Sequence, residues 1–595
     1  MIPVRRILPA LLAVLAAACS AESGRTGSSS DELRELGEAE VLADLETLGA
    51  TIRASYGPLD YKHELFGLDL DHEMDLARAR VHEAKTEGER LRALYMLTGA
   101  LRDLHVSLTA GRDSDGAAQK MLPVALAPVE DGKYAITVVQ PWYENPQVAV
   151  GDVVTSFDGA SIAELEASLA TFADYGVLTS SRERWASHLV NRKRWMPDVL
   201  QPKGDSVKVG IERADGTQTI VELRWTRMLD LAEQLNSFLP PAPEEGTPAA
   251  AQPRALPISP QAIQMQLEES QPRTAAPGPF PNVPFFYNET VAKELGLAEV
   301  KPSVVPDTAT GLGAVKYSYN GKTLLLLRIP TWNPPDIEAN LDWIHALLME
   351  SQQGAADDPD VSKRPIDAVV IDETHNGGGT PSYVQGVASM FITDPIPGDS
   401  MSFRADRKWL GSFASSISYD TETAASKKYW TDGTRALESA IDSGATVSPL
   451  MRDPYVSYGT DIPVGDEAYG PSITAHPKGV WKGPTVVLVS SRSVSAADMF
   501  PMVMQNGHVA TIFGTQTAGG GGMVEKMLTL TNSGLAFHCT RGFFGVYPTD
   551  GGPFRYVENN GVMPDVPHPL TAADVRGKYV DYVKHFSEVA STLKR

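Results

Sequence analysis

Serine, histidine and glycine occur in the C-terminal half of the chain in patterns that suit nucleophilic catalysis. The first such segment, residues 371–379, has the sequence IDETHNGGG and directly follows an apolar run. Three consecutive glycines let backbone N–H groups approach a ligand closely, as an oxyanion hole requires. A phosphate loop is excluded as the alternative, because no Lys-Ser/Thr pair follows the glycines.

The second segment, residues 490–500, places serines between an apolar run and a helical pattern. Its sequence is SSRSVSAADMF. A serine at a strand-to-helix junction lies at a helix N-terminus, which favours developing negative charge, so Ser495 could act as a nucleophile. Ordinary helix capping is the alternative for this segment alone, because serine is a usual N-cap residue. A third segment, residues 513–522, is a glycine-rich turn after another apolar run.

The elements around these segments alternate between strand and helix. Four apolar runs predict buried strands, and the spacing of apolar residues over 337–349 predicts a helix. Continuous apolar strands separated by helices indicate an α/β fold with a largely parallel sheet that is covered on both faces. The predicted strands are residues 324–329, 368–372, 485–489 and 510–514.

The N-terminal half has a different pattern. Apolar residues recur at helical spacing over residues 71–102, which predicts two or three helices. The segment 151–159, GDVVTSFDG, followed by a helix that begins near Ile162, resembles the strand and turn of PDZ domains, which bind peptide ends by adding a strand to a sheet edge. Short strands are also predicted around it, at residues 135–139, 152–157 and 207–211.

A proline-rich stretch separates these regions from the catalytic segments. Residues 240–284 hold 12 of the 43 prolines of the chain. Because proline lacks a backbone donor and fixes φ, this stretch is neither a helix nor a central strand. It is either a flexible spacer or a segment that covers a cleft until it is removed.

In this order and spacing, the three catalytic segments resemble the C-terminal-processing (tail-specific) and tricorn-core serine peptidases. The family pattern is D-x-R-x-N-x-G-G after a strand, then S-A-S-E with the nucleophile first, then G-x-x-T-x-G. Residues 372–379, 495–498 and 514–519 match it. The resemblance covers about residues 320–570 and implies a ClpP/crotonase-like catalytic domain, with a helical N-terminal region and a PDZ-like domain before it.

The expected base distinguishes two branches of this family. The tail-specific branch has a lysine in the last glycine turn, where this chain has Gly520, and the nearest basic residue is Lys526. The tricorn branch supplies a histidine from a D-x-H segment and a glutamate before G-V-x-P-D, which residues 103–105 and 558–565 match. With the PDZ-like segment and the proline-rich insert, the chain most closely resembles the branch of the chlamydial protease-like activity factor.

The resemblance and the chemistry of the side chains agree on the roles. Histidine transfers protons near neutral pH, and a carboxylate orients it and stabilises its cation. We therefore assign Ser495 as nucleophile, His105 as base and Glu558 as orienting acid. In the tricorn branch a serine precedes the histidine and relays to the glutamate. Since this chain has Leu104 there, Glu558 must reach His105 directly or through water.

The oxyanion donors assigned here are the N–H groups of Gly378 and Ala496, with Gly377 or Gly379 as alternatives if the turn shifts by one residue. His375, inside the glycine motif, is the rival base, and we expect it to line the wall of the site. His508, in a glycine-containing turn, is expected at the surface. No metal or cofactor is expected, because none of the three His-Glu pairs of the N-terminal region continues to H-E-x-x-H.

The N-terminus predicts export. Residues 1–19 contain two arginines and a 12-residue apolar stretch, too short to span a bilayer, and end in Ala-Ala-Ala-Cys. Small residues before Cys19 resemble a bacterial lipoprotein cleavage site, which implies a lipid anchor. The alternative is an ordinary signal peptide. We expect a lipoprotein of the periplasm or the outer membrane, or a secreted protein, with residues 20–30 as a Ser/Gly-rich tether.

Composition limits the remaining function classes. The chain has 595 residues, of which 42% are hydrophobic and 21% charged, as in packed globular proteins of several domains. With 52 basic and 74 acidic residues its net charge is −22, which argues against nucleic acid as the main partner. Two cysteines, Cys19 and Cys539, exclude a disulfide framework and a zinc site with several cysteine ligands.

Together these patterns predict an exported serine endopeptidase that cleaves protein or peptide substrates through an acyl-enzyme. The resemblance also implies a homodimer and self-processing within the insert. The alternatives are a non-catalytic ligand- or peptide-binding protein on the same fold and a Ser/Lys tail-specific peptidase. The expected division is a signal peptide (1–19), a tether (20–30), a helical region with the catalytic histidine (31–118), a PDZ-like domain (119–228), the proline-rich insert (229–284) and the catalytic domain (285–595).

Overall fold

The structure, a computed structural model, describes most of the chain beyond the N-terminus. The described residues are 35–109, 120–140, 143, 147–227, 288–304, 312–417, 424–452, 472–549 and 551–594. The predicted signal peptide with Cys19, the tether and the proline-rich stretch 240–284 lie outside them. Within the described ranges, no helix is both long enough and apolar enough to cross a membrane.

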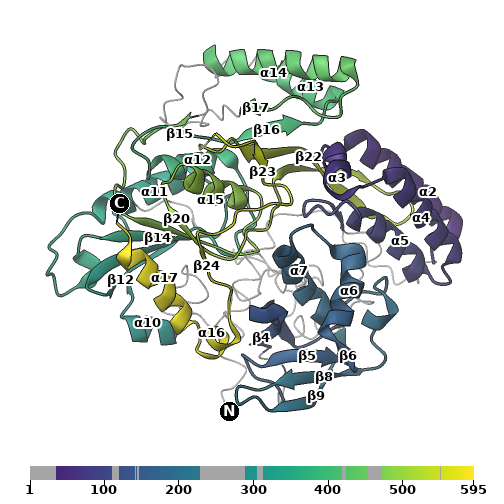
Figure 1. Cartoon of the computed structure of the whole chain (residues 1–595), viewed down its shortest axis with the longest axis horizontal. Helices are drawn as coiled ribbons and strands as arrows, with labels where there is room; N and C mark the ends of the chain where they lie inside the picture. Colours follow the sequence, from purple (N-terminus) through teal and green to yellow (C-terminus); the bar gives the residue numbers. More distant parts are fainter. Residues whose placement is uncertain are drawn as a thin grey trace, which may run out of the picture.

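A seven-stranded sheet forms the centre of the C-terminal half (Figure 1). Its strand order is β11-β12-β13-β14-β19-β20-β24, with parallel pairing from β13 to β24 and antiparallel pairing at the β11–β12 edge. The four predicted strands are confirmed as β13, β14, β19 and β20. The bounds are β11 (Ala298–Glu299), β12 (Gly313–Tyr319), β13 (Lys322–Arg328), β14 (Ala368–Asp372), β19 (Thr485–Val489), β20 (Thr511–Gly514) and β24 (Val566–Pro567).

Helices cover both faces of this sheet, as the continuous apolar strands predict. In β14, Val369 and Ile371 belong to one hydrophobic core and Ala368 and Val370 to the other, because successive side chains of a strand point to opposite faces. The first core includes α11 (Ile337–Glu350), α12 (Pro381–Ser389) and α15 (Ala496–Asn506), and the second includes α10 (Glu289–Leu295), α16 (Ala572–Arg576) and α17 (Val580–Thr592).

A second sheet joins the N-terminal region to the catalytic half. Its central strand, β22 (Ala536–Val546), pairs antiparallel with the short strand β1 (Ser107–Thr109), which begins two residues after His105. The other members are β16 (Ser400–Phe403), β17 (Met451–Arg452), β21 (Gly522–Thr529) and β23 (Arg555–Tyr556), and α13 (Arg407–Ser416) and α14 (Ala424–Ser443) lie above them in Figure 1.

The N-terminal helices and the sheet that follows them share one hydrophobic core. The run 71–102 contains two helices, α4 and α5, and the predicted strands and helix further along are β4, β5, β8 and α6. The helices are α2 (Glu38–Ser55), α3 (Leu59–Phe66), α4 (Leu70–Glu83), α5 (Glu87–Gly99), α6 (Ile162–Ala173) and α7 (Leu178–Val190). The sheet has six strands: β3 (Val124–Pro128), β4 (Tyr134–Val139), β5 (Val153–Phe157), β8 (Ser206–Glu212) and β9 (Gln218–Arg224) follow one another in this order, and β6 (Ala160–Ser161) pairs with β5.

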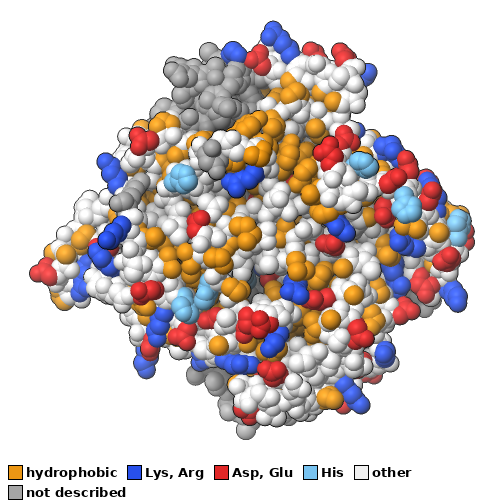
Figure 2. All heavy atoms as spheres, viewed as in Figure 1, with side chains coloured by type: hydrophobic (Ala, Val, Ile, Leu, Met, Phe, Trp, Pro, Cys, Tyr) orange, Lys and Arg blue, Asp and Glu red, His pale blue; other side chains and the backbone are white. Residues whose placement is uncertain are grey.

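Short elements complete the described chain. Three two-residue strands form a small sheet, and two others pair with each other. They are β2 (Lys120–Met121), β7 (Asn191–Arg192) and β10 (Thr226–Arg227), then β15 (Ile396–Pro397) and β18 (Ser472–Ile473), and the 3-10 turns are η4 (Glu130–Gly132), η5 (Asp198–Leu200) and η6 (Val361–Lys363). Figure 2 shows acidic and basic side chains interspersed over one face of the molecule, with hydrophobic side chains gathered near its middle.

Candidate active site

Ser495 is the residue directly before α15, in the turn that follows β19. Its backbone has φ 62° and ψ −117°, a conformation that residues other than glycine rarely adopt. An ordinary N-cap residue has extended backbone instead, as Thr86 before α5 does with φ −120° and ψ 159°. Capping alone therefore does not explain Ser495, and strain of this kind is typical of a functional turn.

The glycine loop after β14 packs directly against Ser495. A Cβ atom on Gly378 would lie 2.7 Å from Ser495 Cβ, 2.5 Å from the Val494 carbonyl oxygen and 3.1 Å from the Ala496 nitrogen. With φ +94° as well, this position accepts only glycine. The N–H of Gly378, predicted as an oxyanion donor, here donates to Asn376 Oδ1 (2.9 Å). It must exchange that acceptor before it can bind a substrate oxygen.

Asp498 forms hydrogen bonds to both the third segment (residues 513–522) and the turn that carries Ser495. Its Oδ1 accepts hydrogen bonds from Thr517 Oγ1 (2.5 Å) and the Gly519 N–H (2.9 Å). Its Oδ2 accepts from the N–H groups of Ser495 (2.8 Å) and Gly520 (3.2 Å). Burial raises the pKa of Asp498 to about 6, and these hydrogen bonds oppose the rise. In the sequence, Asp498 stands out only as the last residue of the 495–498 motif. The structure shows that four hydrogen-bond donors converge on it.

His105 is brought to this site by the pairing of β1 with β22. A Cβ atom on Gly520 would lie 3.5 Å from His105 Cε1. The ring Nδ1 of His105 is buried and has no hydrogen-bond partner among the described residues. Burial lowers the pKa of His105, and Asp103 opposes the shift. The imidazole is therefore neutral at pH 7, which is the form that accepts a proton.

Glu558 lies beside this histidine, fully buried. A ring nitrogen of His105 and carboxylate oxygens of Asp103 and Glu558 all lie within 4.8 Å of one another. No hydrogen bond joins His105 to Glu558 in the described part of the chain. The Glu558 carboxylate instead accepts from Lys62 Nζ (2.5 Å, at Oε1) and from the Gly521 N–H (3.1 Å, at Oε2).

The surroundings of Glu558 oppose its ionisation in part. Burial raises its pKa, the neighbouring Asp103 raises it further, and Lys62 lowers it. Asp103 is itself buried, and it accepts from the Tyr56 hydroxyl (2.8 Å) and from the backbone N–H of His105 (2.8 Å). These three acidic and imidazole groups could also be read as metal ligands, but the Lys62 ammonium on Glu558 disfavours a cation there.

Lys526, His508 and His375, the other basic residues considered from the sequence, lie outside the group formed by Ser495, His105 and Glu558. Lys526 is exposed on β21, so it does not stand in for a catalytic lysine. His508 is exposed, as expected. His375 has φ +60° and lines a neighbouring cavity. The sequence gives no sign of Lys62 and Tyr56, because only the fold brings them into contact with Glu558 and Asp103.

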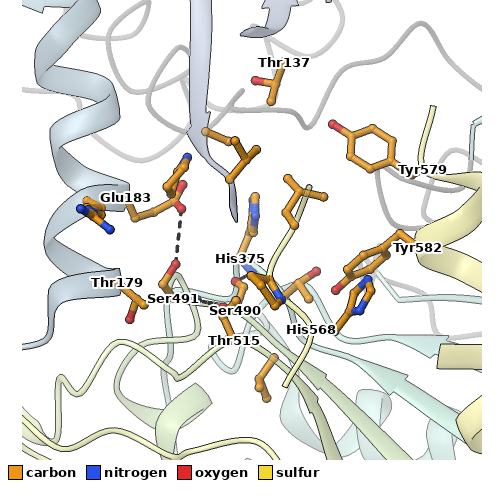
Figure 3. Close-up of a pocket in the computed structure, with 18 residues that line it drawn as sticks. Thr137, Thr179, Glu183, His375, Ser490, Ser491, Thr515, His568, Tyr579 and Tyr582 are labelled. Carbon is orange, nitrogen blue, oxygen red and sulfur yellow. Dashed lines mark hydrogen bonds between the residues drawn. The ribbon is translucent and has the colours of Figure 1, made fainter. Parts of the chain in front are cut away.

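A cavity of about 140 Å³ lies between the sheet that contains β3 and β4 and the catalytic half. Figure 3 shows His375, Ser490 and Thr515 at its base, Glu183 on one side and Tyr582 on the other. Ser491 Oγ donates to Glu183 Oε2 (3.3 Å), and Arg492 Nε also donates to Glu183. These contacts join α7 to the loop that leads to Ser495, although Ser495, His105 and Glu558 do not line the cavity.

A family model and two chlamydial proteins match this chain. Residues 356–568 match peptidase family S41. A protein of Chlamydia trachomatis serovar D is 24% identical over 582 residues, covering 91% of this chain and 91% of the relative. A protein of Chlamydia pneumoniae is 23% identical over 601 residues, covering 95% of this chain and 92% of the relative.

Solved structures share the overall fold. The structure of mature CPAF complexed with lactacystin matches with a TM-score of 0.65 and 18% sequence identity, covering 93% of this chain and 98% of that one. Mature CPAF alone matches with a TM-score of 0.64 at 18% identity, covering 92% of this chain and 96% of that one. The predicted mixed helix-and-sheet fold is thus confirmed over nearly the whole chain.

Proposed function

We propose that Ser495, His105 and Glu558 form the catalytic set of this chain. The premise is that the chain carries a peptidase family S41 domain and is a serine peptidase. Protein or peptide chains are its substrates. The observation that carries the proposal is the convergence, around Gly520, of a strained serine turn, a half-buried histidine with a lowered pKa and a buried glutamate from three distant parts of the sequence. This convergence disfavours the non-catalytic binding protein, which needs no such set.

The proposed reaction begins with proton transfer to histidine. Ser495 Oγ attacks the carbonyl carbon of the scissile peptide bond while a ring nitrogen of His105 accepts the hydroxyl proton. The C–N bond then breaks, and the proton passes from His105 to the leaving amine. Water attacks the resulting ester, with His105 taking one of its protons and returning it to Ser495 Oγ as the carboxylic acid leaves.

The oxyanion of each tetrahedral intermediate is assigned to backbone donors. The Ala496 nitrogen and the Gly378 backbone both lie against Ser495, which supports these two N–H groups as the donors. Because the Gly378 N–H donates to Asn376 in the unbound chain, substrate binding has to turn this peptide toward the reacting carbonyl. The N–H groups of Gly377 and Gly379 are the alternatives.

Glu558 is assigned to the stabilisation of the imidazolium formed on His105. Its separation from the ring, within 4.8 Å and without a direct hydrogen bond, supports an electrostatic or water-bridged contact. The Ser/Lys alternative needs a lysine near Ser495. Gly520 occupies the expected place, and Lys526 is exposed on β21.

The finer domain assignment is part of the proposal. We assign residues 119–228 to a PDZ-like domain, supported by an antiparallel six-stranded sheet that packs with α6 and by its motif at residues 151–159. We assign residues 285–595 to a ClpP/crotonase-like catalytic domain, supported by the parallel strands β13 to β24 with helices on both faces. The helical region 31–118 supplies His105.

Export, lipid attachment at Cys19, homodimer formation and self-processing in residues 229–284 are proposed on the sequence alone. A relative described as mature CPAF supports processing. Mass spectrometry of the protein from membranes tests the lipid, and its intact mass over time tests processing. If the Ser495→Ala chain is cleaved as quickly as the wild type, self-processing is wrong.

A serine-directed fluorophosphonate probe tests the catalytic assignment. The purified wild-type chain should be labelled on Ser495, and the Ser495→Ala variant should not be labelled. Labelling that persists in Ser495→Ala would show that the nucleophile lies elsewhere. A wild type that stays unlabelled even after removal of residues 240–284 would favour a binding protein on a peptidase fold.

A further inference from the structure

We propose that Lys62 is a positioning residue of this peptidase, and that its buried ammonium group favours the ionised form of the Glu558 carboxyl group and fixes it beside His105. The inference rests on the proposed function, because it assigns Lys62 a role that acts through Glu558. Lys62 comes from α3, far from the three segments that carry the family motifs.

The contacts of Lys62 use the full hydrogen-bonding capacity of its ammonium group. Its side chain is completely buried, and Nζ donates to Glu558 Oε1 (2.5 Å), to the Arg102 carbonyl oxygen (3.0 Å) and to Asn559 Oδ1. An ammonium group has three donors, so all of them are engaged. Such a group has one orientation, and it fixes the carboxylate that it binds.

These contacts also set the spacing between the base and the acid. Arg102 is three residues before His105, and its carbonyl oxygen accepts from both Lys62 Nζ and Asn559 Nδ2 (2.7 Å). Lys62 Nζ therefore contacts both the loop that carries His105 and the Glu558–Asn559 turn, and it fixes their positions relative to each other. Gly521, from the third glycine segment, donates its N–H to the other Glu558 oxygen.

Lys62 also balances the charge of the site. Asp103 and Glu558 are both buried next to His105, and burying a carboxylate without a partner is unfavourable by several kcal/mol. Asp103 has the Tyr56 hydroxyl and the His105 N–H as donors. The cation bound to Glu558 is Lys62. Without it, burial and Asp103 would drive Glu558 to take up a proton.

Charged groups that face the cluster besides Lys62 are Asp103 and Arg184. Three further titratable groups, Tyr56 after α2, Tyr61 in α3 and Cys539 in β22, keep their protons near neutral pH. Burial raises the pKa of Tyr61 and of Cys539 to about 12, and it raises that of Tyr56 well above its usual range. The pH dependence of the site is therefore attributed to Glu558 and His105.

Replacing Lys62 with methionine removes the charge and nearly preserves the length of the side chain. The rate of labelling of Ser495 by an uncharged fluorophosphonate is measured from about pH 5 to about pH 10. For Lys62→Met we expect a fall of about tenfold or more at pH 7, and a half-maximal rate at a pH about one unit higher. Raising the pH should restore part of the loss, because it ionises Glu558 again.

Lys316→Met is the matched control. Lys316 is also a buried lysine and lies in β12, near one edge of the seven-stranded sheet. Its Nζ donates to the carbonyl oxygens of Ser362 (3.2 Å) and Arg364 (2.9 Å). This variant should lose stability and keep the wild-type pH profile. If Lys62→Met does not fold, Lys62→Gln, which retains donors without charge, should show the same alkaline shift.

A double variant separates a role through Glu558 from a general structural role. In the Glu558→Gln background, Lys62→Met should add less than about a twofold further loss, because its target is already neutral. A folded Lys62→Met or Lys62→Gln with the wild-type pH profile, or losses that multiply in the double variant, would overturn the role of Lys62. Failure of the proposed function is distinct, since Ser495 would then not be labelled in the wild type at all.

Discussion

Gly520 lies beside the ring of His105, and a Cβ atom on Gly520 would be 3.5 Å from His105 Cε1, an ordinary van der Waals distance. The same atom would lie 3.4 Å from Leu104 Cδ2 and 3.0 Å from Val494 Cγ1. The resemblance to tail-specific peptidases places their lysine at this position. Leu104 and His105 therefore line the space beside Gly520, the position at which the tail-specific peptidases have their lysine.

This arrangement predicts which basic residue the enzyme needs. His105→Ala should reduce the rate of fluorophosphonate labelling by about a thousandfold or more, because no other group in the proposed set accepts the serine proton. Lys526→Ala should label at the wild-type rate, since Lys526 is exposed on β21. The opposite pattern, in which Lys526→Ala is not labelled and His105→Ala is labelled at the wild-type rate, would establish a Ser/Lys mechanism.

The contact between Gly378 and Ser495 predicts that position 378 does not tolerate even the methyl group of alanine. Gly378→Ala would place a methyl group 2.7 Å from Ser495 Cβ in a backbone conformation that costs about 1–3 kcal/mol for other residues. Labelling should fall about tenfold or more. Gly377→Ala is the control, because its Cβ would meet nothing within 4 Å and its N–H is retained. Equal labelling of the two variants would argue against this packing.

Asp498 should matter for both stability and activity. Asp498→Asn places an amide where four donors converge, and the loss of charge-assisted hydrogen bonds should lower the free energy of unfolding by about 2–4 kcal/mol. Labelling of Ser495 should fall with it. Asp574→Asn, a buried aspartate in the capping box of α16, should lose stability alone. Comparable labelling losses in both variants would point to a general folding effect.

The pH dependence of labelling should report Glu558. Burial lowers the pKa of His105 and raises that of Glu558, so the acidic limb of the profile is set by the ionisation of the carboxylate. The rate should rise with pH through a value above that of an ordinary glutamate, because only the ionised form stabilises the imidazolium. Glu558→Gln should be slower and nearly flat over the same range. A limb retained in Glu558→Gln would assign it to another group.

Much of the fold could be predicted because its signals are local. The strands β13, β14, β19 and β20 are short apolar runs, and the helix after Ser495 begins where the pattern changes. The three glycine and serine segments each lie at the end of a strand, so their order along the chain already indicates a common edge of the sheet. The acidic residue at 498 was visible, while its four donors were not.

The sequence alone determined the chemistry: a serine after a strand, glycine loops beside it, and a histidine and a glutamate in recognisable contexts. The tertiary structure decided which side chains surround them. Lys62 reaches Glu558 across 496 positions, and Asn376 accepts the N–H of Gly378. The physical reason is that a side chain's partners in a buried site are selected by packing between distant elements, which leaves no periodicity or spacing in the sequence.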